Sequence, residues 1–181
     1  MLYFAYGSNL LTERLVHRCD AARPLGHAQA PGYRVGFAKY SRVDGSGKAT
    51  ILEDAGAAWG VLYELPGAQL DVLDEFEGVG KGYDRLDSLT VQGPEGTCEA
   101  VSYIASEPRE GLPPFDWYLA LILAGVRQHR LPEAVWEGFH GTEHVPDPDP
   151  GRPGYQAAVR ALEAAGHKGW RSLLRVTDAA E

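Results

Sequence analysis

The stretch that decides the fold is Leu2-Tyr-Phe-Ala-Tyr-Gly-Ser-Asn-Leu-Leu-Thr-Glu-Arg-Leu15. Its aromatic and apolar first half predicts a short buried strand that ends at the glycine. The apolar spacing over about residues 10–18 predicts an amphipathic helix, for which Ser8 or Asn9 is the right residue type as N-cap. Residues 6–9 therefore lie where a strand ends and a helix begins, a place where backbone N–H groups lack helical partners.

Five further strands are predicted beyond this stretch, from runs of aromatic and β-branched residues over about 33–40, 49–53, 58–64, 84–92 and 97–105. Helices are expected over about 69–77, 115–129 and 155–165. Because the helices do not alternate regularly with the strands, the pattern predicts an α+β or mixed-barrel domain rather than a doubly wound sheet.

The length of 181 residues predicts a single domain over residues 1–181, in which a proline-rich connector, 146–154, leads to a C-terminal helical extension. The chain carries 17 Lys and Arg residues against 25 Asp and Glu residues, a formal net charge of −8. Nucleic acids and anionic membranes bind clustered positive charge, so this balance disfavours both as partners. A small-molecule substrate is the expectation.

The two cysteines, Cys19 and Cys98, are too few for a disulfide framework and lie in no zinc-binding or redox motif. The N-terminus has no basic segment followed by a long apolar one, and no apolar run approaches the roughly 18 residues of a membrane span. These features predict a reducing, cytoplasmic setting.

The segment Leu70-Asp-Val-Leu-Asp-Glu-Phe-Glu-Gly78 contains the first candidate for chemistry. On a helix with about 100° per residue, Glu77 falls on the apolar side, whereas the other three carboxylates of the segment face away from it. Gly78 is the natural residue to end this helix, which places Glu77 at the negative end of the helix dipole. An acidic side chain that points into the protein calls for an explanation.

Burial, the neighbouring acids and the helix dipole would all raise the proton affinity of Glu77, as a general acid/base at neutral pH requires. No basic residue lies between Pro66 and Lys81 to oppose them. The alternative is a structural role, in which Glu77 accepts a hydrogen bond from a backbone N–H or pairs with an arginine such as Arg85.

The loop over residues 6–9 is the second candidate, because a glycine lets a ligand approach the backbone and free N–H groups can hold a carboxylate or an oxyanion. The alternative is an ordinary connection. Residues 45–50 resemble a phosphate loop but lack its first glycine, which predicts a hairpin turn. His140 and His144 have metal-ligand spacing, but Gly141 between them favours a solvated loop.

Three segments taken together, in order and spacing, resemble the γ-glutamylcyclotransferase family of the wider AIG2-like superfamily: Tyr3-Phe-Ala-Tyr-Gly-Ser-Asn-Leu-Leu-Thr-Glu-Arg14, Trp59-Gly-Val-Leu-Tyr63 and Leu73-Asp-Glu-Phe-Glu-Gly-Val79. The resemblance extends over about residues 2–133. It implies a small mixed β-barrel of about six strands flanked by helices. It also implies an enzyme that cyclises a γ-glutamyl group to 5-oxoproline and releases an amino acid or amine, with no metal or organic cofactor.

The resemblance assigns the catalytic glutamate to Glu77. The positions that correspond to the family's substrate-binding residues are Tyr3, Phe4, Ala5, Tyr6, Gly7, Ser8, Asn9, Tyr83 and Tyr118. The spacing before Tyr83 is one residue shorter than in the family, which leaves open whether this side chain reaches the pocket.

The expected partner is thus a small γ-glutamyl compound, and the resemblance leaves a monomer or a homodimer open. Two alternatives stand beside this reading. One is a cyclotransferase that trims a γ-glutamyl group from an aminoglycoside or polyamine conjugate, a cationic substrate that an acidic surface would suit. The other is a non-catalytic AIG2-like module that binds a small metabolite.

Overall fold

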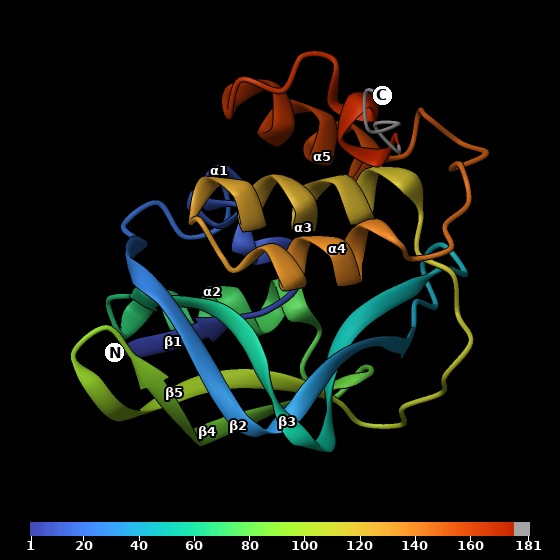
Figure 1. Ribbon diagram of the computed structural model, residues 1–181. Helices are drawn as coiled ribbons and strands as arrows, with labels where there is room; N and C mark the ends of the chain where they lie inside the picture. The colour runs from blue at the N-terminus through green and yellow to red at the C-terminus, as the bar shows by residue number, and fades with distance from the viewer. Residues whose placement is uncertain (176–181) are drawn as a thin grey trace, which may run out of the picture.

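In the computed structural model of the protein, which describes residues 1–175, five strands form a closed barrel with helices packed on it (Figure 1). The strands are β1 (Leu2–Ala5), β2 (Arg23–Tyr40), β3 (Gly47–Glu64), β4 (Tyr83–Gly93) and β5 (Gly96–Ala105). Their order around the barrel is β1-β3-β2-β4-β5. β1 pairs antiparallel with β3 and parallel with β5, so the barrel is mixed. The predicted α+β barrel flanked by helices is confirmed.

The prediction of about six strands is wrong by one, because residues 49–53 and 58–64 belong to a single strand, β3. β2 also begins at Arg23, well before the expected start at residue 33. The two strands pair antiparallel along most of their length. Two of the three register shifts lie at glycine or proline residues of β2, and the third lies between Phe37 and Lys39. A β-bulge lets a strand pass through residues that read as strand breakers in the sequence.

The described residues also form five α-helices and two short 3-10 helices. They are η1 (Ser8–Leu10), α1 (Thr12–Val16), α2 (Ala68–Glu77), α3 (Asp116–Gln128), α4 (Glu133–His140), α5 (Pro153–Ala164) and η2 (Trp170–Leu174). The helices predicted over 69–77, 115–129 and 155–165 correspond to α2, α3 and α5. Helix α4 was not predicted, and His140 is its last residue rather than part of a loop.

The helix predicted over residues 10–18 is divided in two. Leu11 is extended, with φ −74° and ψ 118°, and separates η1 from α1. Neither Ser8 nor Asn9 caps a helix with its side chain, so that prediction is wrong. The Asn9 amide is bonded elsewhere, as described below.

Helix α3 holds the N-terminal stretch in place. Residues 116–126 of this helix are all buried, and Figure 1 shows it between the barrel and α5. A helix that is apolar on every side needs such cover. A Cβ added at Gly125 would lie 2.6 Å from the backbone carbon of Leu10, so a larger residue there would push η1 away. This close contact fixes how near residues 7–11 lie to α3.

Both cysteines are free thiols, Cys19 buried and Cys98 partly buried. Within residues 1–175, no helix combines the length and the apolar character needed to cross a membrane. The same residues contain no group of three or more His, Cys, Asp or Glu side chains arranged to hold a metal ion.

Candidate active site

A cavity lies where β1 runs into η1, with an empty volume of about 300 Å³ that is partly open to solvent. Its lining residues are Tyr3, Tyr6, Gly7, Ser8, Asn9, Ala49, Glu77, Tyr83, Tyr103 and Tyr118. The cavity thus brings together eight of the ten residues singled out from the sequence, Tyr83 included. Phe4 and Ala5 do not line it, because both are buried in the core.

Glu77 is the last residue of α2, and the helix ends there because Gly78 takes the left-handed conformation, with φ 70°. The Glu77 side chain is 16% exposed. Its Oε1 accepts hydrogen bonds from Asn9 Nδ2 at 2.9 Å and from Arg18 Nη1 at 2.8 Å. Both bonds use the same oxygen. Among residues 1–175, no group donates a hydrogen bond to Oε2. One carboxylate oxygen is therefore anchored while the other is available to a ligand.

Arg18 is the basic partner that the sequence pattern missed. Arg85, the partner suggested by the structural alternative for Glu77, pairs with Asp74 and Asp87 instead. The absence of a basic residue between Pro66 and Lys81 does not leave Glu77 without a cation, since Arg18 comes from a segment 59 residues earlier. The Arg18 side chain is 11% exposed, which makes this a largely desolvated ion pair.

A second guanidinium lies close to this pair. Arg14 is 8% exposed, and within the described part of the chain its Nε has no hydrogen-bond partner. Burial and, to a smaller extent, the charge of Arg18 lower the pKa of Arg14 to about 9, although the charge of Glu77 acts to raise it. The spacing of Arg14 and Arg18, one helical turn apart, is the only sequence signal that could have indicated this basic side of the site.

Asn9 holds the polar groups of the site together. Its Nδ2 donates to Tyr3 Oη as well as to Glu77 Oε1, each at 2.9 Å, and its Oδ1 accepts from Arg18 Nη1 at 3.1 Å. We refer to Tyr3, Asn9, Arg18 and Glu77 as the carboxylate cluster. Because both ends of the Asn9 amide are engaged, its side chain orients Glu77 and has little capacity left for a ligand.

The tyrosines form a rigid, neutral wall. Tyr6 Oη donates to the Tyr103 carbonyl, and Tyr83 Oη donates to the Ala49 carbonyl at 2.6 Å. Tyr118 differs, because its oxygen accepts a bond from the Ala49 N–H at 3.1 Å and keeps its own proton. Burial raises the pKa of Tyr118 to about 12, so this hydroxyl is a neutral donor at physiological pH.

The space around Gly7 is tight. A Cβ at this position would lie 3.2 Å from both Ala49 Cβ and Tyr118 Oη. The Leu10 N–H donates to the Gly7 carbonyl and closes the first turn of η1. The N–H groups of Ser8 and Asn9 precede that first helical donor, and among residues 1–175 they have no backbone acceptor, as is typical of a helix start.

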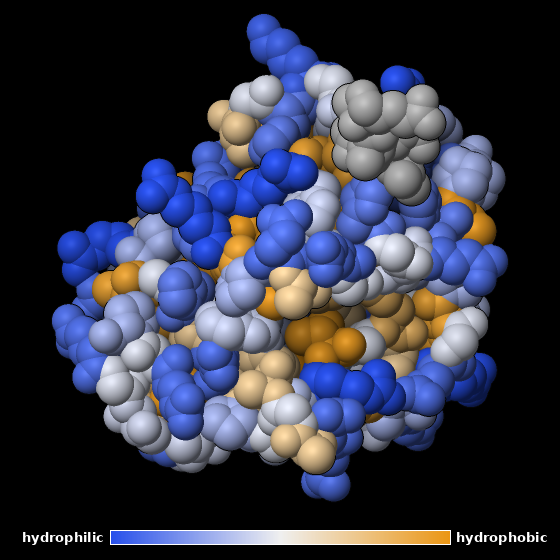
Figure 2. Space-filling view, viewed as in Figure 1, coloured by the Kyte–Doolittle hydropathy of each residue, from blue (hydrophilic) through white to orange (hydrophobic). Residues whose placement is uncertain are grey.

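The cavity wall at Tyr118 is supported from behind by apolar side chains. Phe37 packs edge to face on Tyr118, with ring centroids 6.4 Å apart, and in the same way on Phe139 of α4. Figure 2 shows the hollow beneath α4 in which hydrophobic side chains gather. This packing separates the cavity from the hollow and fixes the Tyr118 ring.

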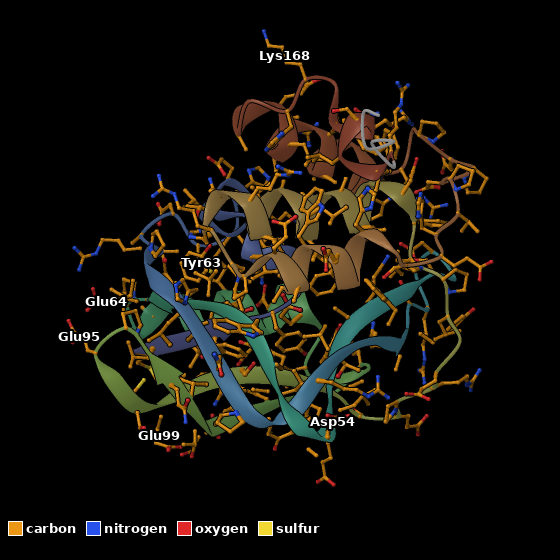
Figure 3. All side chains as sticks on the ribbon, in the orientation of Figure 1. Asp54, Tyr63, Glu64, Glu95, Glu99 and Lys168 are labelled. Carbon is orange, nitrogen blue, oxygen red and sulfur yellow. The ribbon has the colours of Figure 1, made fainter. Side chains whose placement is uncertain are left out.

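A second hydrogen-bonded group holds the same loop from its other side. Tyr63 Oη donates to the Leu10 carbonyl at 3.0 Å and lies 3.2 Å from His129 Nε2. Thr12 Oγ1 lies 3.1 Å from Tyr63 Oη and 3.0 Å from His129 Nε2. We refer to Thr12, Tyr63 and His129 as the anchor cluster; Figure 3 shows Tyr63 between the barrel and the helices.

Fold and site together define a protein of the AIG2-like class, and a model of the AIG2-like family matches residues 57–137. The γ-glutamylcyclotransferase of Homo sapiens is 36% identical over 150 residues, 78% of each chain, and that of Mus musculus is 34% identical over the same share. A solved structure described as a γ-glutamyl cyclotransferase superposes with a TM-score of 0.78 at 30% identity and covers 90% of this chain and 98% of its own. The chain belongs to the γ-glutamylcyclotransferase family, a family of enzymes.

Proposed function

We propose that this enzyme converts a γ-glutamyl amino acid or γ-glutamyl amine into 5-oxoproline and the free amino acid or amine, with Glu77 as general acid/base. The observation that carries the proposal is the Glu77 carboxylate at the cavity, with Oε1 fixed by Asn9 and Arg18 and Oε2 unengaged within the described residues. The family's name supports the reaction class.

The reaction joins two ends of one molecule, since the substrate's α-amine attacks its own γ-carbonyl carbon. Most of the catalytic demand is therefore to hold the glutamyl chain folded back on itself. A small cavity with a rigid tyrosine wall suits that task, because the hydroxyls of Tyr6 and Tyr83 are already bonded to the backbone.

Glu77 would move the proton. In the proposed sequence, Oε2 accepts a proton from the substrate's α-ammonium, the amine attacks, and a bond forms between this nitrogen and the γ-carbon. The bond from that carbon to the leaving nitrogen then breaks as Glu77 returns a proton to the leaving nitrogen. A second proton passes from the ring nitrogen to the leaving nitrogen, so that of the four protons on the two nitrogens of the substrate, one stays on the lactam and three leave with the ammonium of the product.

The oxyanion of the tetrahedral intermediate needs donors. The backbone N–H groups at the start of η1 and the free Tyr118 hydroxyl proton are neutral donors at the same cavity. A fixed donor of this kind contributes on the order of 3 kcal/mol to the stabilisation of an oxyanion.

The test is incubation of the purified protein with a panel of γ-glutamyl dipeptides, γ-glutamyl amines and aminoglycoside conjugates, with mass-spectrometric detection of 5-oxoproline. We expect 5-oxoproline and the free amine in equal amounts from at least one class. Tight binding of 5-oxoproline without turnover of any substrate would instead indicate a binding module and contradict the proposal.

A further inference from the structure

The charge around the cavity differs in sign from the charge of the whole chain. The net charge is −8, and Figure 3 shows acidic side chains such as Asp54, Glu95 and Glu99 on the outside of the barrel, pointing away from it. Among the residues that line the cavity, Glu77 is the only charged one. The guanidinium groups of Arg14 and Arg18 act on it from one side, so the site has an excess of positive charge within an acidic protein.

Lys39 adds a third cation, which packs on the ring of Tyr83, and this ring forms part of the cavity wall; we refer to this part of the wall as the rim. It lies on β2 next to a register shift between Phe37 and Lys39, and its Nζ is 5.0 Å from the centroid of the Tyr83 ring. The neighbouring Gly82 leaves room for it, because a Cβ there would lie 3.0 Å from Lys39 Cε. The Lys39 ammonium is thus held against a wall of the cavity.

The two acids whose charges act on Lys39, Asp44 and Glu77, already have other partners. Asp44 pairs with Lys48 at 2.8 Å, and Glu77 pairs with Arg18. No salt bridge of Lys39 itself occurs within residues 1–175. Burial lowers the pKa of Lys39, while the charges of Glu77 and Asp44 act to raise it, so the ammonium is both partly desolvated and within the field of Glu77. A desolvated cation without a counter-ion is prepared for an anionic ligand.

We propose that Lys39 is a specificity-determining residue that binds the carboxylate of the leaving amino acid. This inference rests on the proposed function, in which the leaving nitrogen must lie next to Glu77. In a γ-glutamyl α-amino acid, a carboxylate is attached one carbon from that nitrogen, so a cation at the rim of the same cavity is well placed to bind it. A polyamine or aminoglycoside conjugate would bring a further positive charge to this cationic rim, where like charges repel.

The experiment uses two substrates that differ in this carboxylate, γ-glutamyl-L-alanine and γ-glutamylethylamine. The wild-type protein is expected to turn over the alanine compound with a kcat/KM about 10- to 100-fold higher, the range for a hydrogen bond to a charged group. Lys39→Met should bring the ratio close to one, mainly through the alanine compound, and Lys39→Arg should restore much of the preference. Lys168→Met, which removes the same charge at the far end of the molecule in Figure 3, is the matched control and should keep the wild-type ratio.

Two results would overturn the inference while leaving the proposed function in place. One is a wild-type ratio close to one. The other is a Lys39→Met protein that is active and keeps the wild-type preference. If Lys39→Met does not fold, the test uses the kcat/KM ratio of the two substrates in the wild type and in Lys39→Arg. The inference predicts that the arginine variant keeps much of the wild-type ratio, and a ratio close to one in this variant would contradict a role for the charge. The absence of 5-oxoproline from both substrates with wild-type protein would instead overturn the proposed function.

Discussion

The carboxylate cluster and the anchor cluster hold the two sides of one short segment, residues 7–12, and they differ in what they leave unused. The anchor cluster is neutral, and Tyr63 Oη contacts the Leu10 carbonyl, Thr12 and His129. The carboxylate cluster contains an ion pair and leaves an oxygen of Glu77 without a donor among residues 1–175. The difference indicates that one cluster stabilises the loop and the other acts on a ligand.

Glu77→Gln should have the largest effect. The amide keeps the shape of the side chain and removes its ability to take up a proton, so kcat should fall about 100- to 10,000-fold. Circular dichroism and the melting temperature should stay close to those of the wild type. Near-normal turnover of the best substrate would place the general base on another residue.

Arg18→Met tests whether this residue acts through Glu77. Loss of the fixed Oε1 contact should lower kcat by about 10- to 100-fold, since misplacement of a reacting group by about 1 Å has an effect of that size. In the Glu77→Gln background the same change should cost less than about threefold, because residues that act as a unit are not additive. Equal losses in both backgrounds would mean that Arg18 works independently of Glu77.

Tyr63→Phe probes the anchor cluster. The variant leaves the buried Leu10 carbonyl without its hydroxyl donor, which should lower the free energy of unfolding by about 1–2 kcal/mol. Because no atom of this cluster lines the cavity, kcat should change by less than about threefold. Urea denaturation and steady-state kinetics measure the two quantities. A large loss of kcat with unchanged stability would erase the distinction between the clusters.

His129→Gln should have the smallest effect, a change only in how the free energy of unfolding depends on pH. Burial lowers the pKa of His129, so the folded protein binds this proton less tightly than the unfolded chain does. The free energy of unfolding therefore decreases as the pH falls through about 6.5, the pKa of histidine in the unfolded chain. The variant should lose less stability than the wild type between pH 7.5 and pH 5, as measured by urea denaturation at both values. An equal loss in the two proteins would show that His129 does not contribute.

The sequence could predict the placement of Glu77 because a helix repeats locally. Three or four neighbouring residues suffice to show which side of α2 is apolar, and Gly78 marks its end. Arg18 could not be predicted as its partner in this way, since the contact depends on how the turn after α1 lies relative to the end of α2. The length of β2 could not be predicted for a related reason. Its glycine and proline residues are typical of strand ends, whereas in the fold β2 continues past them through register shifts against β3.

The role of Asn9 shows the same limit within a single residue. Its position suggested a helix cap, and caps are the common use of asparagine at such a place. The folded chain brings Glu77, Tyr3 and Arg18 within reach of its amide, and these partners replace the cap. The local sequence indicated that Asn9 has a structural role, but it did not show which groups its side chain binds.

The closure of the barrel by β1 and β5 has a consequence for the time course of folding. Ser102 Oγ donates to the Phe4 carbonyl, across 98 residues of chain, and Tyr3 is in register with Val101. Contacts between such distant segments form slowly, because a long loop must be ordered before they are made. On the ribosome, the residues that open the chain would wait for β5, and Tyr118 is made later still. The cavity, one wall of which follows β1 directly, is thus expected to be among the last parts of the molecule to mature.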